Sequence, residues 1–126
     1  VVRKSVQPYK GGAYMKKTTK QKKIPKNIAQ YLKQIQDMCE RNGATLLLVS
    51  TPSAKNWNYK KHKGVAQWAN ENGVEYLDLN LDQEIGIDWK KDTKDGGDHL
   101  NYTGAKKVTH AMGEYFKTHY DLNTDE

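Results

Sequence analysis

The same three-part pattern occurs twice in this chain of 126 residues, and it limits the folds that the chain can adopt. Apolar residues at helical spacing end at an Asn-Gly pair, at 42–43 and again at 72–73, and a short apolar run follows each pair. Glycine accepts the left-handed backbone that commonly ends a helix, and the short runs have the length of buried strands. Helices and strands in alternation predict parallel strands joined by crossover helices, so the expected fold class is α/β.

The first unit starts at Pro25, because proline is well tolerated in the first turn of a helix. The apolar residues after it recur at i, i+3, i+4 and i+7, which predicts an amphipathic helix. These residues are Ile28, Tyr31, Leu32, Ile35, Met38 and Cys39. The run 45–49 then predicts a strand buried on both faces, with the loop 50–53 at its carboxyl end. Cys39 is the only cysteine, so no internal disulfide can form, and we expect a buried structural thiol.

The second unit predicts a helix at about 59–72 and a strand at 74–79. Residues 80–98 show no periodicity, and a last helix is expected at about 102–119. Two strands make a thin sheet, because parallel sheets normally have several strands and both faces covered. We therefore expect part of the sheet to be missing on the amino-terminal side. An open apolar edge of this kind favours self-association with a second copy.

Positive charge is concentrated at the start of the chain. Residues 1–36 hold ten Lys or Arg and no Asp or Glu, whereas residues 37–126 hold eleven basic and fifteen acidic residues. We expect a basic extended arm at 1–24, the α/β domain at 25–120 and a frayed tail at 121–126. The arm can be a solvated connection, or it can contact an anionic polymer or a membrane surface. Nucleic acid is less favoured as a partner, because Tyr9 and Tyr14 are too few to form a stacking platform.

Several kinds of site find no support in the sequence. The glycine pair at 96–97 has neither the lysine of a P-loop nor the GxGxxG spacing of a dinucleotide site. No apolar run approaches the roughly 18 residues of a membrane-spanning helix. The histidines lack the paired spacing of zinc sites, and three of them are expected on helix surfaces or at the core edge: His62, His110 and His119. We therefore expect no cofactor and no metal.

The stretch 95–107 carries the strongest chemical signal. Asp95 and Asp98 flank the glycine pair and lead into His99, and a helix that Asn101 or Thr103 can cap starts behind it. A histidine beside carboxylates can be held in one tautomer and act as a general base near neutral pH. Open α/β sheets bind ligands at the carboxyl ends of their strands, where the loop 50–53 and the end of the second strand are also expected. The alternative is a histidine with a purely structural hydrogen bond.

Three blocks of sequence carry a resemblance to a known family. They run from Leu46 to Pro52, from Tyr76 to Leu79 and from Asp98 to Lys107. In this order, over roughly residues 25–120, they resemble the carboxyl-terminal half of the SGNH (GDSL-like) hydrolases. The resemblance is closest to the exported SGNH proteins of Gram-positive bacteria that are related to teichoic-acid D-alanylation and polysaccharide O-acetyl-transfer proteins.

The resemblance implies a fold and a set of site residues. The fold would be part of a flavodoxin-like three-layer sandwich with parallel strands. His99 would be the general base, oriented by Asp98 in preference to Asp95. The family spacing Asp-x-x-His is not kept, because Gly96 stands three residues before His99. Further residues would line the substrate pocket: Ser53, Asn56 and Trp57.

The resemblance also implies an activity and a partner. The parent protein would be a serine esterase or O-acyltransferase acting on an acylated glycan or polymer, extracellular or in the bacterial cell envelope. In the family, the blocks with the nucleophilic serine and the oxyanion-hole Gly and Asn precede this region, and this sequence lacks them. We therefore expect a fragment that is inactive alone and that completes its site with the missing amino-terminal half of the domain. The alternative is a non-catalytic surface module that binds an anionic polymer through the basic arm.

Overall fold

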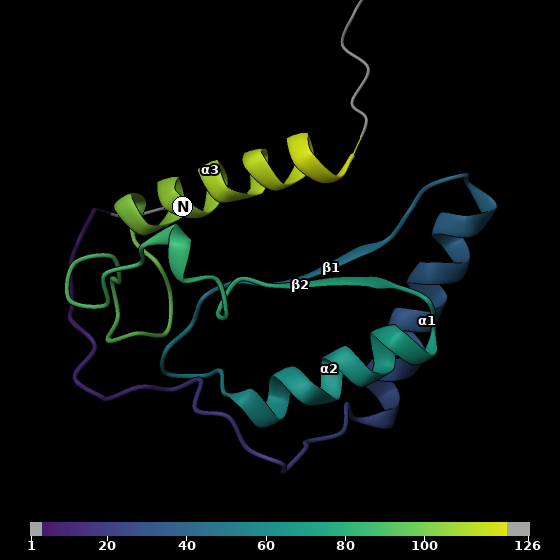
Figure 1. Cartoon of the computed structure of the whole chain (residues 1–126), viewed down its shortest axis with the longest axis horizontal. Helices are drawn as coiled ribbons and strands as arrows, with labels where there is room; N and C mark the ends of the chain where they lie inside the picture. Colours follow the sequence, from purple (N-terminus) through teal and green to yellow (C-terminus); the bar gives the residue numbers. More distant parts are fainter. Residues whose placement is uncertain (1–3, 121–126) are drawn as a thin grey trace, which may run out of the picture.

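The computed structural model describes residues 4–120 and has the element order that the repeated pattern predicts (Figure 1). The elements are α1 (Lys26–Arg41), β1 (Leu47–Ser50), α2 (Tyr59–Glu71), β2 (Glu75–Asp78), a short 3-10 helix η1 (Gln83–Ile85) and α3 (Tyr102–His119). Asn42 and Asn72 are the carboxyl-terminal caps of α1 and α2, and the glycines after them have φ of 68° and 66°. The prediction that each helix ends at Asn-Gly is therefore confirmed, and the reason is the left-handed backbone that glycine allows.

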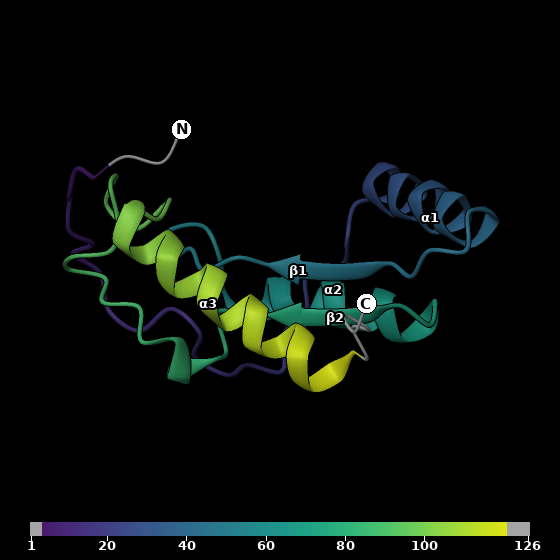
Figure 2. The same cartoon turned by 90° about the horizontal axis from the view of Figure 1, so that it is seen from above.

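β1 and β2 form a two-stranded parallel sheet, so the mixed α/β character is confirmed. The register pairs Leu47 with Glu75 and Ser50 with Asp78, which brings the carboxyl ends of both strands to the same edge. Figure 1 shows α2 on one side of the sheet and α3 on the other, and Figure 2 shows α1 beyond β1, on the side away from β2. Among residues 4–120, β1 has no second strand partner.

The buried apolar core is small. Its buried apolar residues are Ala54, Ala69, Val74 and Leu79. The prediction that β1 is buried on both faces is wrong: Val49 is 36% exposed, and the other β1 residues are half-buried. The physical reason is the outer edge of β1, which no further strand covers among residues 4–120. Cys39, expected to be buried, is also only half-buried.

One face of α1 shows the same lack of cover. Ile28, Tyr31, Ile35 and Met38, which follow helical spacing, are 43%, 65%, 42% and 56% exposed. We call these four side chains the α1 apolar stripe. Monomeric proteins rarely leave such a contiguous row of large apolar side chains in water.

From residue 4 to residue 24 the arm has no helix or strand, and it lies along the body of the molecule. The Gln7 N–H donates to the Thr93 carbonyl at 3.0 Å, the Tyr9 N–H donates to the Trp89 carbonyl at 2.9 Å, and the Gly96 N–H returns a bond to the Gln7 carbonyl at 2.9 Å. The first part of the arm is thereby placed beside the loop that carries His99. The predicted tail at 121–126 lies outside the described residues. None of the helices described is both long and apolar enough to span a bilayer.

Candidate active site

Thr93 shapes the loop that presents His99. Its side chain is fully buried, and its hydroxyl donates to the His99 carbonyl at 2.7 Å and accepts the Gly97 N–H at 2.9 Å. A single antiparallel bridge between Thr93 and Leu100 closes the loop. Gly96 and Gly97 turn the chain with φ of 74° and 102°, values that side-chain-bearing residues rarely adopt. The glycine pair is thus explained by backbone geometry.

Asn101 fixes the same loop to the start of α3. Its Oδ1 accepts the Gly104 N–H at 3.1 Å, which confirms Asn101 as the helix cap. Its Nδ2 donates to the carbonyls of Lys91 at 2.7 Å and Ser5 at 3.1 Å. Because Asn101 is only 1% exposed, these bonds are shielded from water, and one side chain holds the loop, the helix and the arm together.

Asp92 forms a second anchor between the loop and α3. Its carboxylate accepts from the Lys107 ammonium at 2.6 Å, the Thr103 hydroxyl at 2.7 Å and the Asp88 N–H at 2.8 Å. Burial opposes ionisation of this carboxyl, but these three donors outweigh it and lower the pKa of Asp92.

His99 and Asp95 form a hydrogen-bonded pair at the tip of the loop. Nδ1 of His99 lies 2.6 Å from Oδ2 of Asp95, and the His99 N–H donates to Oδ1 of the same carboxylate at 2.6 Å. Desolvation by the loop raises the pKa of Asp95, but the two bonds from His99 outweigh it, and the pKa is lowered overall. The His99 side chain is 64% exposed, and among the described residues no hydrogen bond reaches its Nε2. The ring is therefore held through one nitrogen and leaves the other available for a proton.

Asp98, which the sequence analysis ranked first as the orienting carboxylate, has a different position. Its Oδ2 lies 3.6 Å from His99 Nδ1, beyond hydrogen-bonding distance, and its Oδ1 accepts from the Asn56 amide. The extra residue relative to Asp-x-x-His explains the difference, because the turn at Gly96 and Gly97 folds Asp95 back over His99.

Two of the three predicted pocket residues touch this loop. Ser53 Oγ donates to the Asp98 carbonyl at 2.8 Å, and Asn56 contacts the Asp98 carboxylate. Trp57 points elsewhere: its indole N–H donates to Asp78 Oδ2 at 2.8 Å. The loop after β1 therefore meets the His99 loop through Ser53 and Asn56, while Trp57 belongs to a neighbouring network.

The sequence analysis missed that network, which centres on Asp78 at the end of β2. The Asp78 side chain is 1% exposed and accepts five hydrogen bonds. Oδ2 accepts from Trp57 at 2.8 Å, His62 Nδ1 at 2.8 Å and the Tyr76 hydroxyl at 3.1 Å. Oδ1 accepts from the backbone and side-chain N–H groups of Asn80 at 2.9 and 2.8 Å. His62 is thus at the core edge, one of the two positions considered for it.

Asn80 connects this network to the candidate active site. Its Oδ1 accepts the Ser53 N–H at 2.9 Å and the Tyr14 hydroxyl at 2.9 Å. Burial, with help from the charge of Asp78, raises the pKa of Tyr14 to about 12. A chain of bonds therefore runs from Asp78 through Asn80 and Ser53 to the loop that holds His99. The end of the second strand was expected at the ligand-binding edge, but no sequence signal pairs Asp78 with Trp57 or His62.

Metal binding is the other chemistry that this geometry allows. Among the described residues, Asp95, Asp98 and His99 form one group whose ligand atoms lie within 4.8 Å of one another. Asp95 already uses both oxygens for His99, and Asp98 uses one for Asn56. These hydrogen bonds direct Asp95 toward His99 and Asp98 toward Asn56.

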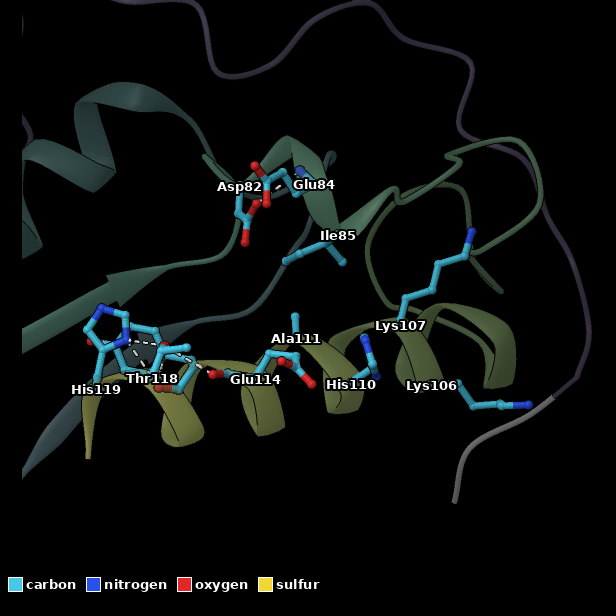
Figure 3. A pocket seen from close by; sticks show the side chains of 11 residues that line it. Asp82, Glu84, Ile85, Lys106, Lys107, His110, Ala111, Glu114, Thr118 and His119 are labelled. Atoms are coloured by element: carbon cyan, nitrogen blue, oxygen red, sulfur yellow. Dashed lines mark hydrogen bonds between the residues drawn. The ribbon is translucent and has the colours of Figure 1, made fainter. Parts of the chain in front are cut away.

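A hollow of about 600 Å³ lies between η1 and α3, and none of the predicted site residues lines it (Figure 3). Figure 3 shows His110 and His119 well separated along α3, so these two rings do not form a common site. Charged side chains of both signs line the hollow, including Glu84, Lys106 and Glu114. It is separate from the His99 loop.

No family model, curated protein or solved structure matches the chain.

Proposed function

We propose that this chain provides the His–Asp half of a serine-dependent acyl-transfer site, as in the carboxyl-terminal half of an SGNH-type hydrolase. The observation that carries the proposal is the His99–Asp95 pair, in which the carboxylate binds Nδ1 and Nε2 stays exposed. This is the arrangement that a general base requires, because the carboxylate fixes the tautomer and stabilises the imidazolium that forms.

In the proposed reaction, Nε2 of His99 removes the proton from a serine hydroxyl while the serine oxygen attacks the ester carbonyl. The imidazolium then returns that proton to the alcohol that leaves, and an acyl-serine forms. In the second step, water or a sugar hydroxyl loses its proton to His99 and attacks the acyl carbonyl, the bond from the acyl carbon to the serine oxygen breaks, and the imidazolium returns the proton to that serine oxygen. Asp95 stays ionised throughout, consistent with its lowered pKa. The proposed substrate is an acylated glycan or polymer of the bacterial cell envelope.

The serine of this reaction is expected from outside the described residues. The sequence holds only Ser5, Ser50 and Ser53. The Ser53 hydroxyl donates to the Asp98 carbonyl, and the Ser50 hydroxyl shares a bond of 2.6 Å with Tyr76. Neither hydroxyl is bonded to His99, and Ser5 lies in the arm, where its carbonyl binds Asn101.

The proposed partner is a polypeptide segment that carries the serine and adds strands to the sheet. The unpaired edge of β1 and the α1 apolar stripe support this proposal, because both are surfaces that proteins normally cover. With the added strands, the chain would complete a flavodoxin-like three-layer sandwich.

The test joins the chain to the proposed serine-bearing segment and measures ester hydrolysis and acyl transfer together with the melting temperature. His99→Ala is expected to lower turnover by several orders of magnitude without lowering the melting temperature. Asp95→Asn should cost more activity than Asp98→Asn, because Asp95 makes the bond to Nδ1. His110→Ala on the exposed side of α3 is the control. Full activity in His99→Ala, or a loss that follows unfolding, would refute the proposal.

One observation favours the alternative of a polymer-binding module. The arm lysines Lys10, Lys16, Lys17 and Lys20 are exposed, and among the described residues no carboxylate lies within 4.0 Å of their ammonium groups. A binding module predicts salt-sensitive retention of the chain on immobilised polyphosphate and loss of retention when these lysines become glutamine. Retention that survives this change contradicts the alternative.

A further inference from the structure

A narrow apolar groove lies between the end of the arm, the start of α1 and the first half of α2. Its volume is about 290 Å³. Six of its nine lining residues are apolar: Ile24, Pro25, Ile28, Leu32, Trp57 and Val65. Their side chains come from segments that Figure 1 shows meeting below the sheet, on the α2 side. The groove is therefore separate from the hollow between η1 and α3.

The wall formed by the arm is fixed in place. The Lys22 N–H donates to the Lys60 carbonyl at 3.0 Å, and the Lys63 ammonium donates to the Thr19 carbonyl at 3.1 Å. Gly64 of α2 is buried at this contact, and a side chain there would collide with the Lys22 carbonyl. The arm can therefore contact α2 closely because Gly64 has no side chain, and this contact forms one wall of the groove.

All charged residues that line the groove are lysines, and we call these lysines its rim. The three remaining lining residues are Lys22, Lys23 and Lys61, and no acidic residue lines the groove. The Lys61 ammonium donates to the Asn56 carbonyl at 2.7 Å, which holds its charge at one end of the groove. An apolar floor with a cationic rim is complementary to a molecule with an apolar chain and an anionic head.

We propose that this groove binds a free single-chain anionic amphiphile, with its alkyl chain against Ile28, Leu32 and Val65 and its carboxylate or phosphate head at the three lysines. The volume is close to the lower limit of the roughly 300–1,000 Å³ that is usual for ligand pockets, which fits one short chain. The inference does not depend on the proposed acyl-transfer function, because it uses neither His99 nor a serine.

Trp57 lines the groove and provides the assay. In a Trp68→Phe, Trp89→Phe background, octyl phosphate and octanoate, below their micelle concentrations, are expected to change Trp57 fluorescence in a saturable manner. Affinity should rise roughly fourfold for each added methylene from hexyl to octyl phosphate. Octyltrimethylammonium and inorganic phosphate alone should give no saturable change.

Two variants test the rim and one tests the floor. Lys22→Gln and Lys61→Gln should each weaken octyl phosphate binding at least threefold, and Ile28→Ser, at a partly exposed position, should reduce the gain per methylene. Lys90→Gln, which lies outside the groove, is the control. Circular dichroism checks that each variant is folded.

The proposal is overturned by equal binding of the cationic amphiphile, by lysine variants that bind like the parent, or by a response to phosphatidylglycerol vesicles without one to monomeric octyl phosphate. Because the readout is binding alone, its failure leaves the His99–Asp95 proposal untouched. Loss of activity in His99 variants likewise leaves the groove untouched.

Discussion

Asp78→Asn probes the buried network that supports the candidate site. The wild-type carboxylate only accepts hydrogen bonds, and in the structure it accepts five of them, from four residues. In the variant, the amide oxygen can still accept the two hydrogen bonds from Asn80. The amide nitrogen is then a donor that faces the groups of Trp57, His62 and Tyr76. His62 can change tautomer and Tyr76 can rotate its hydroxyl, whereas the indole N–H of Trp57 can only donate.

The expected loss of unfolding free energy is about 3 kcal/mol, because one buried donor–donor contact remains and two groups must rearrange. For a domain of this size the melting temperature should fall by roughly 10 °C. Trp57→Phe alone should cost about 1 kcal/mol, since it removes a single bond. In the Asp78→Asn background, the same change should cost nothing or restore stability, which gives a coupling energy of about 1–2 kcal/mol.

Urea unfolding followed by circular dichroism measures the unfolding free energies of the parent, the two single variants and the double variant, which together form a double-mutant cycle. Asp37→Asn, at an exposed carboxylate 3.6 Å from Lys33, is the matched control and should stay within about 0.5 kcal/mol of the parent. Asp78→Asn that unfolds like the control, or zero coupling to Trp57→Phe, would refute the reasoning from donor and acceptor roles.

Three further predictions concern acid stability, association and reactivity. Ionised Asp92 contributes stability above the usual aspartate pKa of about 3.9, and this is lost as pH falls through its lowered pKa in the folded state. Lys107→Met should therefore move the acid transition to higher pH, unlike Lys106→Met; equal midpoints would contradict this. The isolated chain should self-associate through the α1 apolar stripe, so Tyr31→Lys should lower the sedimentation-equilibrium mass, and a monomeric parent at high concentration would count against the idea. The isolated chain should also neither hydrolyse p-nitrophenyl acetate at an enzyme-like rate nor react with a fluorophosphonate; stoichiometric serine labelling with matching turnover would show that a nucleophile is already present.

Helix ends and strand positions could be predicted because their signals are local. Asn42-Gly43 and Asn72-Gly73 ended their helices as expected, since glycine at those positions takes a positive φ. The burial of β1 could not be predicted from its apolar run, because burial depends on neighbours that the run does not encode. Val49 is apolar and still 36% exposed.

The candidate site was predictable in position but not in pairing. Asn101, which caps α3, was one of the two caps expected, and the glycine pair before it has positive φ values. Whether Asp95 or Asp98 reaches Nδ1 depends on how Gly96 and Gly97 fold the loop, which sequence spacing alone does not fix. The bonds that Asp78 receives from Trp57 and His62 join α2, the loop before it and β2, so they arise only from tertiary packing.

The state of the His99 ring nitrogens tests the central claim most directly. Long-range ¹H–¹⁵N correlation spectra of the chain, recorded with the imidazole in its neutral form, distinguish the two neutral tautomers. We expect a proton on Nδ1, bonded to Asp95, and a free lone pair on Nε2. Asp95→Asn should shift this tautomer equilibrium, and Asp98→Asn should leave it unchanged. A dominant Nε2–H form in the parent, or a larger effect of Asp98→Asn, would contradict the assignment of His99 and Asp95 as a general-base pair.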